Sequence, residues 1–417
     1  MNLTEIRKRF TDCPCGRKHD FTIKEIATGS GITCDAGEIL KKNGFFGRLL
    51  FVADENTLAA ADGVKESLEK SGFKLVKRIY KDLRVAEMKE VVAIEGLCDE
   101  VDGIISVGSG SLNDICRLAA ARKNKPLCLF ATAPSMDGFA SYCAPITDGN
   151  FKITYPAKSP EVIIADSRIL ANAPAFLKSA GFGDMVGKYV GLIDWQVSAL
   201  VSGEYYCDNV ASLTKEAVDE LMLLADKVTE NDEQTAMAVF EGLVKTGIGM
   251  SLVKTSRPAS GTEHILSHFW ECKKLLEGKL SDFHGRKVGV ATLLIMKEYE
   301  KFAGFEDVKI KEEVIDWNEV KEAYGELYPE VEKLNNPPVS HEIDSFLIKK
   351  NWQKIRQIIK SMPSEKTIRE KMIAAGSPTE VKEIQVSEEL KDLGMKFHPH
   401  MRHRISLMRL KFLFDEA

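Results

Sequence analysis

The pattern of apolar residues changes once along the chain, near Asp166, and this change constrains the fold more than any other feature. Before Asp166, short apolar runs alternate with helical patterns, which is typical of parallel strands joined by helices. After Asp166, long amphipathic stretches predict helices alone. We therefore predict the α/β class, with an α/β domain over residues 1–166, an all-helical domain over residues 167–417 and a ligand-binding cleft between them.

The first part of the sequence predicts a Rossmann-like parallel sheet. Strands are expected at residues 48–53, 73–80, 101–107, 126–131, 152–155 and 162–165, and helices between them at residues 55–71, 85–97 and 112–123. The clearest helices of the second part are expected at residues 213–231, 234–246 and 286–302. A chain of 417 residues is long enough for two such domains.

Composition narrows the range of partners and compartments. A net charge of −5 gives no reason to expect a basic face for nucleic acid. No apolar run reaches the ~18 residues that a membrane span needs, and the start, MNLTEIRKRFTDCPCG, lacks the apolar stretch of a signal peptide. Nine cysteines scattered over a long chain do not indicate a disulfide framework. We expect a cytoplasmic protein that binds neither nucleic acid nor membrane.

The segment GSGSLND at residues 108–114 follows a predicted strand and begins a predicted helix. Glycines at such a turn let the backbone approach a phosphate, and the helix N-terminus supplies N–H donors. The strict G-x-G-x-x-G spacing is absent, so a tight connection without a ligand is an equal alternative. A second loop, at residues 132–141, follows the next strand, and in open α/β sheets ligands bind at this edge.

Asp54 lies at the end of another predicted strand. An acidic side chain at such a place can accept hydrogen bonds from a ribose and repel a 2′-phosphate, which favours NAD over NADP. The alternative is that Asp54 caps the helix that begins near Glu55, and the sequence supports both roles equally.

Residues with metal-binding chemistry gather in the helical part. They are Asp184 in GFGDMVGK, His264 and His268 in SGTEHILSHFW, and His284 in DFHGR. His264 and His268 are four residues apart, so on a helix both face the same side. One carboxylate and two or three imidazoles can hold a divalent metal and leave a position for substrate. Ordinary surface or capping histidines are the alternative, which spacing alone favours.

Five motifs in order, GSGSLND, TAPSMDGFAS, GFGDMVGKY, SGTEHILSHFW and FHGRKVG, resemble the glycerol-1-phosphate dehydrogenase family. That family belongs to a superfamily with glycerol dehydrogenase, dehydroquinate synthase and iron-containing alcohol dehydrogenases. The resemblance runs from Ala53 to His284, and the C-terminal MRHRISLMRLKFLFDEA is similar as well. It implies a metal-dependent NAD(P) oxidoreductase that interconverts dihydroxyacetone phosphate and sn-glycerol-1-phosphate.

The resemblance also implies a role for each motif. A divalent metal ion would be held by Asp184, His264 and His284. The substrate would be contacted by Asp137, Asp184 and His268, which are also the implied catalytic residues. The dinucleotide would be contacted by Asp54, Gly108, Ser109, Gly110, Ser111, Leu112, Thr132, Ala133, Pro134, Ser135 and Ser141. The family often has His immediately before the substrate-loop Asp, where this chain has Met136.

The implied chemistry is hydride transfer between nicotinamide and the C2 carbonyl of the substrate, with the metal as Lewis acid. Zinc is the expected metal, because imidazole and carboxylate suit it, and nickel and iron(II) are alternatives. His268 is the candidate proton shuttle. The substrate phosphate needs a cation, for which Lys188 and Arg257 are the candidates. The cofactor is expected to be NAD, with NADP as an alternative, and a homodimer is compatible with the chain.

Three other functions compete with this hypothesis. One is a dehydrogenase of glycerol or another unphosphorylated polyol. Another is a lyase that resembles dehydroquinate synthase and uses the nicotinamide only transiently. The third is a protein that keeps the fold and binds metal or nucleotide without catalysis, against which the intact set of Asp184, His264 and His284 argues.

The N-terminal sequence Cys13-Pro14-Cys15-Gly16 with His19 could form part of a zinc site. Cys-x-Cys is shorter than the usual ligand spacing, and no second cysteine pair follows it. A flexible segment with free thiols is therefore the favoured interpretation. The other seven cysteines, Cys207 among them, are expected to be isolated thiols.

Overall fold

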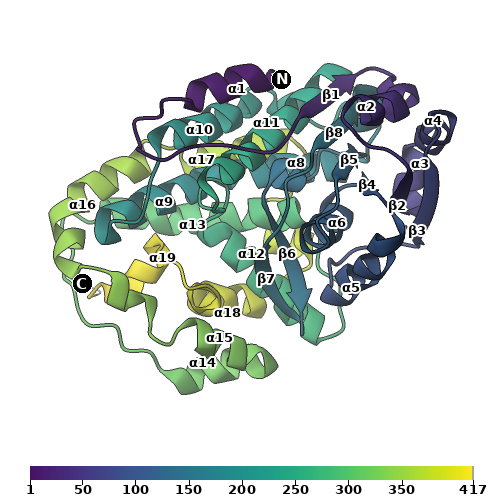
Figure 1. The fold of residues 1–417 in the computed structure, drawn as a ribbon. Coiled ribbons are helices and arrows are strands. Elements are labelled where there is room, and N and C mark those ends of the chain that lie inside the picture. Colours follow the sequence, from purple (N-terminus) through teal and green to yellow (C-terminus); the bar gives the residue numbers. More distant parts are fainter. Residues whose placement is uncertain (416–417) are drawn as a thin grey trace.

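The computed structural model describes residues 1–415 and has a strand-rich half and a helical half (Figure 1). A six-stranded parallel sheet has the order β1-β8-β5-β4-β2-β3, and β6 and β7 form a separate antiparallel pair. The strands are β1 (Glu25–Gly29), β2 (Arg48–Asp54), β3 (Lys74–Tyr80), β4 (Gly103–Gly108), β5 (Leu127–Ala131), β6 (Cys143–Asp148), β7 (Phe151–Pro156) and β8 (Val162–Asp166).

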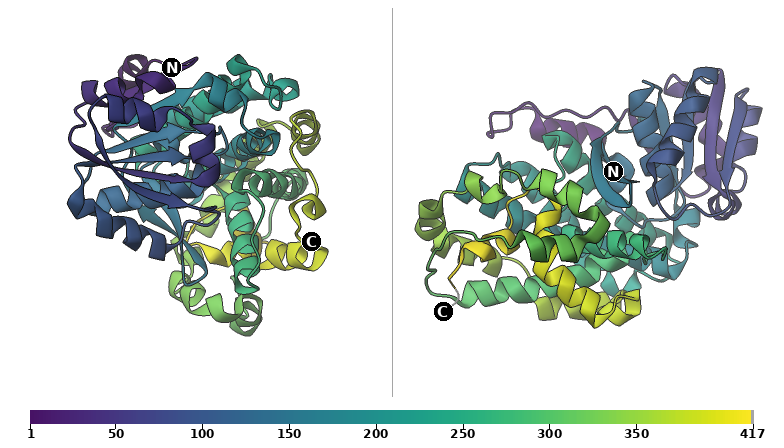
Figure 2. Two further views of the ribbon diagram at one scale, coloured as in Figure 1. Left: turned by 90° about the vertical axis from the view of Figure 1, so that its right-hand side faces the viewer. Right: turned by 90° about the horizontal axis from the view of Figure 1, so that it is seen from below.

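Helices of the strand-rich half connect these strands. They are α1 (Leu3–Phe10), α2 (Ala36–Lys42), α3 (Glu55–Ala60), α4 (Val64–Lys70), α5 (Met88–Leu97) and α6 (Gly110–Arg122), with the short 3₁₀ helix η3 (Asp137–Ala140) after β5. The views of Figure 2 separate this half, which carries the sheet, from the helices of the second half.

The second half holds the remaining helices. They are α7 (Ser167–Ala171), α8 (Ala175–Val186), α9 (Lys188–Ser202), α10 (Asp208–Met222), α11 (Glu233–Val253), α12 (Thr262–Leu276), α13 (His284–Gly304), α14 (Trp317–Tyr324), α15 (Tyr328–Leu334), α16 (Ser345–Lys360), α17 (Glu365–Ala374), α18 (Glu388–Phe397) and α19 (Leu407–Leu410). After β8, the only strand-like pairing among the described residues is an isolated bridge between Ile310 and Phe414. The domain boundary placed at Asp166 stays a prediction.

The central strands are apolar on both faces, as a sheet covered on two sides requires. Leu50 and Val52 of β2 face a core that includes residues of α5, α6 and α11. Their neighbours Leu49 and Phe51 face the opposite core, formed with α2 and α4. Burial on both faces explains why β2, β4, β5 and β8 were recognisable as continuous apolar runs.

The carboxyl ends of β4 and β5 lie side by side, because Gly108 pairs with Ala131 in the ladder. The glycine turn after β4 and the loop after β5 therefore meet at one edge of the sheet. Gly110 has a φ of +42°, a left-handed conformation that glycine adopts without steric cost. The two loops thus meet at the carboxyl edge of the sheet, which is where the sequence predicts a ligand site.

Four details differ from the sequence prediction. The helix expected at residues 213–231 is α10, which begins at Asp208 and ends at Met222. The single helix expected at residues 55–71 is two helices, α3 and α4, separated at Gly63, whose φ is +91°. Strand β1 was not predicted, because its five residues are only half-buried and show no alternation. Strand β6 was not predicted either, and it contains Pro145, which is unusual inside a strand.

Helix α11 has the length and hydropathy of a membrane-spanning helix, but 78% of its apolar window is buried inside the protein. It packs against α7, α8, α10 and η3. This is the packing of a core helix, and it connects the loop after β5 to the helical half.

Candidate active site

A cavity of about 600 Å³ lies between the carboxyl edge of the sheet and helices α12 and α13. We call it the cleft. The predicted site residues that line it are Asp54, Ser109, Gly110, Ser111, Leu112, Thr132, Ala133, Ser135, Asp137, Ser141, His264, His268 and His284. Of the predicted set, Gly108, Pro134 and Asp184 do not line it. The structure thus brings side chains from both halves of the sequence to one cavity.

Three candidate metal ligands converge at the inner end of the cleft. Asp184 of α8, His264 of α12 and His284 at the start of α13 each offer one ligand atom, and these atoms lie within 4.8 Å of one another. We call this set the cleft cluster. The rings of His264 and His284 are 5.1 Å apart, and His264 Nε2 lies 3.4 Å from Asp184 Oδ1. One carboxylate and two imidazoles at this separation suit a divalent metal such as zinc.

Close packing of α8 against α13 holds Asp184 beside His284. A Cβ atom added to Gly285 would lie 1.9 Å from the carbonyl oxygen of Ala180, and one added to Gly183 would lie 2.3 Å from that of Gly285. Only glycine fits such a contact, so these two positions set the distance between the helices. The glycines beside Asp184 and His284 in the motifs therefore have a structural reason.

A hydrogen bond behind His264 fixes the orientation of its ring. His264 Nδ1 lies 2.5 Å from Glu263 Oε1, which leaves Nε2 facing Asp184. A carboxylate behind a ligating histidine is a common arrangement around protein metals. Burial alone would lower the pKa of His264, but Glu263 and Asp184 raise it to about 9. The carboxylates therefore favour a cation at this point.

Lys188 of α9 lies behind the cluster. Its Nζ is 2.7 Å from Asp184 Oδ1 and 2.6 Å from Asp137 Oδ2. Burial disfavours the charged Asp184, but Lys188 and the neighbouring imidazoles hold the pKa of that carboxyl well below its usual range. Asp137 N also donates to Asp184 Oδ2 at 2.9 Å, so the loop after β5 is fixed to the cluster.

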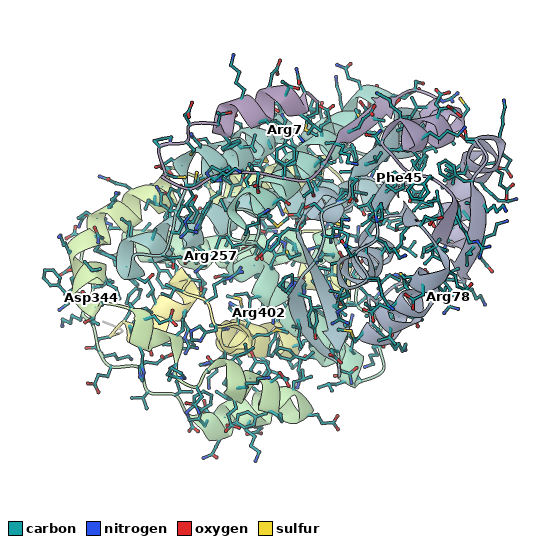
Figure 3. All side chains as sticks on the ribbon, viewed as in Figure 1. Arg7, Phe45, Arg78, Arg257, Asp344 and Arg402 are labelled. Atoms are coloured by element: carbon teal, nitrogen blue, oxygen red, sulfur yellow. The ribbon has the colours of Figure 1, made fainter. Side chains whose placement is uncertain are left out.

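Neither predicted phosphate ligand is available for a phosphate. Lys188 is fully buried between two carboxylates and does not line the cleft. Arg257 lies in the helical half (Figure 3), where its guanidinium binds Glu204 and the carbonyl oxygen of Ile405. The structure does not favour either prediction, because neither cation lines the cleft and each is bonded by partners that are distant in sequence or on the next turn.

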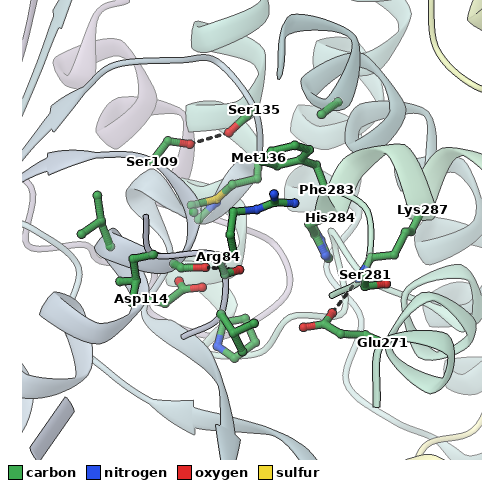
Figure 4. Close-up of a pocket in the computed structure, with 18 of the residues that line it drawn as sticks. Arg84, Ser109, Asp114, Ser135, Met136, Glu271, Ser281, Phe283, His284 and Lys287 are labelled. Atoms are coloured by element: carbon green, nitrogen blue, oxygen red, sulfur yellow. Dashed lines mark hydrogen bonds and ion pairs between the residues drawn. The ribbon is translucent and has the colours of Figure 1, made fainter. Parts of the chain in front are cut away.

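A different pair of cations lines the cleft, and the sequence analysis missed it. Lys152 of β7 and Lys287 of α13 bind opposite oxygens of Glu271 of α12, at 2.9 and 2.8 Å. Figure 4 shows Lys287 and Glu271 in contact on the wall that also carries His284. Because two ammonium groups share one carboxylate, one positive charge is left over. The sequence did contain a signal for two of these residues. Lys287 and Glu271 each lie three residues after a predicted site histidine, which places them on the same helix face as that histidine.

His268 faces the same part of the cleft. Its ring stacks on His284 at 5.5 Å, and burial lowers its pKa to about 3, so the ring is neutral near pH 7. Its Nδ1 lies 3.5 Å from Glu271 Oε2 and has no hydrogen-bond partner in the described part of the chain. His268 is thus placed between the cleft cluster and the lysine pair.

The predicted dinucleotide-binding loops form the other wall. The hydroxyl groups of Ser109 and Ser135 contact each other across the two loops (Figure 4). Met136, at the position where the family often has His, accepts a hydrogen bond at its Sδ from Gly138 N at 2.8 Å. Arg84 lies over the ring of Phe283 at 4.0 Å, which links this wall to the start of α13.

Asp54 caps α3, and it also lines the cleft. Its Oδ1 accepts from Thr57 N at 2.8 Å, and its backbone N–H donates to Thr57 Oγ1 at 3.0 Å, which is a reciprocal capping box. Among residues 1–415, no hydrogen bond is made by Oδ2. Asp54 therefore caps α3 through Oδ1. Because Oδ2 is available, the contact with a ribose stays a prediction.

Comparison with known proteins identifies the family. The family model described as iron-containing alcohol dehydrogenase matches residues 27–174. A glycerol-1-phosphate dehydrogenase [NAD(P)+] from Halalkalibacterium halodurans is 30% identical over 413 residues, covering 97% of this chain and 96% of that protein. The chain belongs to the glycerol-1-phosphate dehydrogenase family. A second member, from Geobacillus stearothermophilus, is 29% identical over 99% of this chain and 97% of its own length.

Solved structures agree with this family at the level of the fold. An alcohol dehydrogenase from a halo-thermophilic archaeon of a Red Sea brine pool superposes with a TM-score of 0.63 at 16% identity, covering 91% of this chain and 92% of that chain. Glycerol dehydrogenase from Schizosaccharomyces pombe gives 0.57 at 18% identity, covering 88% and 95%. This protein is therefore an oxidoreductase, as the sequence predicted. The predicted α/β fold class is confirmed as well.

Proposed function

We propose that this protein catalyses the metal-assisted, NAD(P)-dependent interconversion of dihydroxyacetone phosphate and sn-glycerol-1-phosphate. One observation carries the proposal: the two histidines of a three-ligand cluster and an uncompensated positive charge line one cleft, opposite a glycine turn at the end of a strand. Such a cleft offers a place for a carbonyl, a phosphate and a dinucleotide together. Family membership supplies the same activity independently.

The residues of the sheet edge are suited to a dinucleotide. The turn from Gly108 to Leu112 begins α6, and residues 109–112 line the cleft, where the N–H groups of a helix start favour a pyrophosphate. The loop from Thr132 to Ser135, with Ser141, forms the adjacent wall. Asp54, farther along the same edge, would accept from a ribose hydroxyl through Oδ2 while Oδ1 keeps its capping bond. A bound nicotinamide would supply the hydride.

The donor set of the cleft cluster fits a divalent metal, and zinc is our proposal. Asp184, His264 and His284 would hold it, with Glu263 fixing the ring of His264. A metal ion bound there would polarise the substrate carbonyl as a Lewis acid. Lys188 keeps Asp184 ionised and aligns Asp137, so that the second carboxylate can contact a substrate hydroxyl.

The shared Glu271 makes the lysine pair a phosphate site. Burial would lower the pKa of Lys152, but Glu271 and Asp114 raise it above its ordinary value, so the group stays charged. A phosphate that approaches Lys152 and Lys287 gains charge-assisted hydrogen bonds without either lysine leaving Glu271. The unphosphorylated ketone cannot use this charge, which favours the phosphate ester over glycerol-type substrates.

His268 is suited to orienting and relaying rather than to acting as a permanent acid. A neutral imidazole has one donor and one acceptor nitrogen, so it can bind a substrate hydroxyl and pass a proton between that hydroxyl and water. Its place beside Glu271 supports contact with the part of the substrate that carries the phosphate.

The proposal is tested by following NADH oxidation with dihydroxyacetone phosphate and by determining the configuration of the product with a chiral assay. We expect sn-glycerol-1-phosphate, because a dinucleotide on the sheet edge and a metal in the cleft cluster would fix which face of the substrate receives the hydride. The mirror-image product, or turnover of a cyclisation substrate without net loss of NADH, would overturn the proposal. On sequence grounds, the proposal also includes a cytoplasmic location and a homodimer. Light scattering of the purified protein tests whether it is a homodimer.

A further inference from the structure

Four residues with metal-ligating atoms meet outside the lining of the cleft. Cys13, Cys15 and His19 come from the segment after α1, and Cys207 immediately precedes α10. One ligand atom of each lies within 4.8 Å of the others. We call this set the N-terminal cluster. Cys207 is therefore not the isolated thiol that the sequence suggested, because 194 residues separate it from a sulfur that it contacts.

The separations in the N-terminal cluster resemble the edges of a metal tetrahedron. Tetrahedral zinc binds sulfur at about 2.3 Å and nitrogen at about 2.0–2.1 Å, which places two sulfurs about 3.8 Å apart and a sulfur and a nitrogen about 3.5 Å apart. Cys13 Sγ lies 3.6 Å from Cys207 Sγ, and Cys207 Sγ lies 3.5 Å from His19 Nε2. Cys15 Sγ lies 3.1 Å from His19 Nε2, a few tenths of an ångström inside that distance.

The surroundings of the N-terminal cluster orient its atoms toward a common centre. His19 Nδ1 lies 3.0 Å from the carbonyl oxygen of Leu252 in α11, so Nδ1 carries the proton and Nε2 is left with its lone pair toward the sulfurs. Asn209 Nδ2 donates to Cys13 Sγ at 3.4 Å, and the hydroxyl of Tyr205 lies 3.2 Å from Cys15 Sγ. Donors aimed at sulfur favour the thiolate, which is the form that binds metal.

We propose that Cys13, Cys15, His19 and Cys207 form a second metal site, a closed structural zinc site of the Cys₃His type. Four protein ligands complete a tetrahedron and leave no position for a substrate. The site joins the N-terminal segment to the start of α10 and, through Leu252, to α11. It does not depend on the function proposed for the cleft.

Contacts on either side show what the site would hold in place. Arg9 of α1 binds Glu216 of α10 at 2.6 Å, and the N-terminal amine binds Glu241 of α11 at 2.7 Å. The segment thus lies along α10 and α11 (Figure 1) and is packed rather than free. Ion pairs near the surface contribute little by themselves. A metal between Cys15 and Cys207 would add to the attachment that the buried Ile6 and Phe10 of α1 provide.

The experiment separates this site from the cleft cluster. Full-length His284→Ala protein, in which the cleft cluster has lost a ligand, is purified without added metal and analysed by mass spectrometry for zinc. We expect about one zinc per chain. Adding Cys15→Ser to that background should remove it, whereas Cys34→Ser, which changes an exposed cysteine outside both clusters, should leave it in place.

Replacement by cobalt(II) reports which atoms bind. In the His284→Ala protein, cobalt should give the intense near-ultraviolet thiolate charge-transfer absorption and the tetrahedral visible bands of a cysteine-rich site. A mercurial thiol reagent added to the native enzyme should release that zinc as the cysteines react. These measurements need no cysteine variant, so they decide the proposal even if Cys15→Ser does not fold.

Three results would overturn the proposal. One is less than about a tenth of a zinc per chain in the folded His284→Ala protein. Another is bound cobalt without thiolate absorption. The third is a disulfide between Cys13 and Cys207 in protein purified from reducing cytoplasm, which would mean that the sulfurs pair with each other instead of with a metal.

Discussion

The cleft cluster and the N-terminal cluster both contain histidine, but they differ in their other ligands, in the number of ligands and in their surroundings. The cleft cluster offers one carboxylate and two imidazoles beside a cavity of about 600 Å³. The N-terminal cluster offers three sulfurs and one imidazole, which contact each other and their hydrogen-bond partners Tyr205 and Leu252. Three ligands next to a cavity leave a coordination position for a substrate, whereas four ligands close the site. In our two proposals, the number of protein ligands therefore distinguishes the catalytic site from the structural one.

The two clusters are also held in different ways. The cleft cluster is carried by three helices, and glycines at positions 183 and 285 set the separation of two of them, α8 and α13. The N-terminal cluster lies on an irregular segment and at one helix start, with few helical contacts of its own. A metal removed from the first should leave the fold intact. A metal removed from the second should release the segment that it holds.

The largest expected effect is that of His264→Ala on activity. Losing an imidazole ligand removes the Lewis acid, and a loss of about 4 kcal/mol of transition-state stabilisation lowers kcat about a thousandfold. The thermal midpoint should change little, since the helices stay packed. The variant is compared with His341→Ala, an exposed histidine outside both clusters. Full activity in metal-free enzyme would refute the assignment of a catalytic metal to this cluster.

The lysine pair predicts the next largest effect. Two charge-assisted hydrogen bonds of about 1.5–3 kcal/mol each predict a preference of roughly a hundredfold or more in kcat/KM for dihydroxyacetone phosphate over dihydroxyacetone. Lys287→Met should reduce that preference by about tenfold or more, mainly through KM for the phosphate ester. Lys273→Met, on α12 but away from the cleft, is the matched control. Equal efficiency on the two ketones would assign the protein to an unphosphorylated polyol instead.

A chelator should distinguish the two sites in the native enzyme. A hydrophilic chelator reaches the open cleft cluster, so activity should fall at least about tenfold and return when zinc is added. Metal analysis of the same sample should still find the zinc of the N-terminal cluster. If both metals leave together, or activity survives the loss of one metal from the cleft, then the distinction between an open and a closed site fails.

Sequence predicted the cleft better than the N-terminal cluster for a physical reason. The loops at residues 108–112 and 132–141 are contiguous, and parallel strands bring their carboxyl ends to one edge, so local pattern and topology suffice. Lys188 and Arg257 do not line the cleft, and sequence alone could not show this, because a charged residue does not reveal the partners that neutralise it. Glu204 and Ile405 accept hydrogen bonds from the guanidinium of Arg257, and their proximity to it is apparent only in the folded structure.

The N-terminal cluster illustrates the limit of spacing. Cys13, Cys15 and His19 are neighbours in sequence, but the fourth ligand is Cys207, on an element of the helical half. No local periodicity links the two positions, and a lone cysteine before a helix carries no signal of its own. The roles assigned to individual residues of the cleft stay predictions that the variants described here test.

Cys15→Ser should have the opposite signature to His264→Ala. Loss of one ligand from a closed zinc site frees the segment between α1 and β1, so the thermal midpoint should fall by at least about 5 °C. At 25 °C, kcat of the folded variant should stay within about twofold of the unchanged enzyme, because no residue of the N-terminal cluster lines the cleft. Thermal unfolding and steady-state kinetics on one preparation measure both. A stable variant with low activity would reverse the roles given to the two clusters.

The smallest expected effect concerns Asp54. It tests whether this carboxylate serves structure or ligand binding, which is the same distinction that separates the two clusters. Asp54 caps α3 through Oδ1, and its Oδ2 is free to meet a ribose. Asp54→Ser keeps a capping oxygen but removes the charge, so it should lose little stability and raise the ratio of NADPH to NADH efficiency about threefold to tenfold. Asp54→Ala removes both and should also cost about 1 kcal/mol of stability. An unchanged cofactor ratio in Asp54→Ser, together with lost stability in Asp54→Ala, would show that Asp54 serves the helix alone and that another group selects the cofactor.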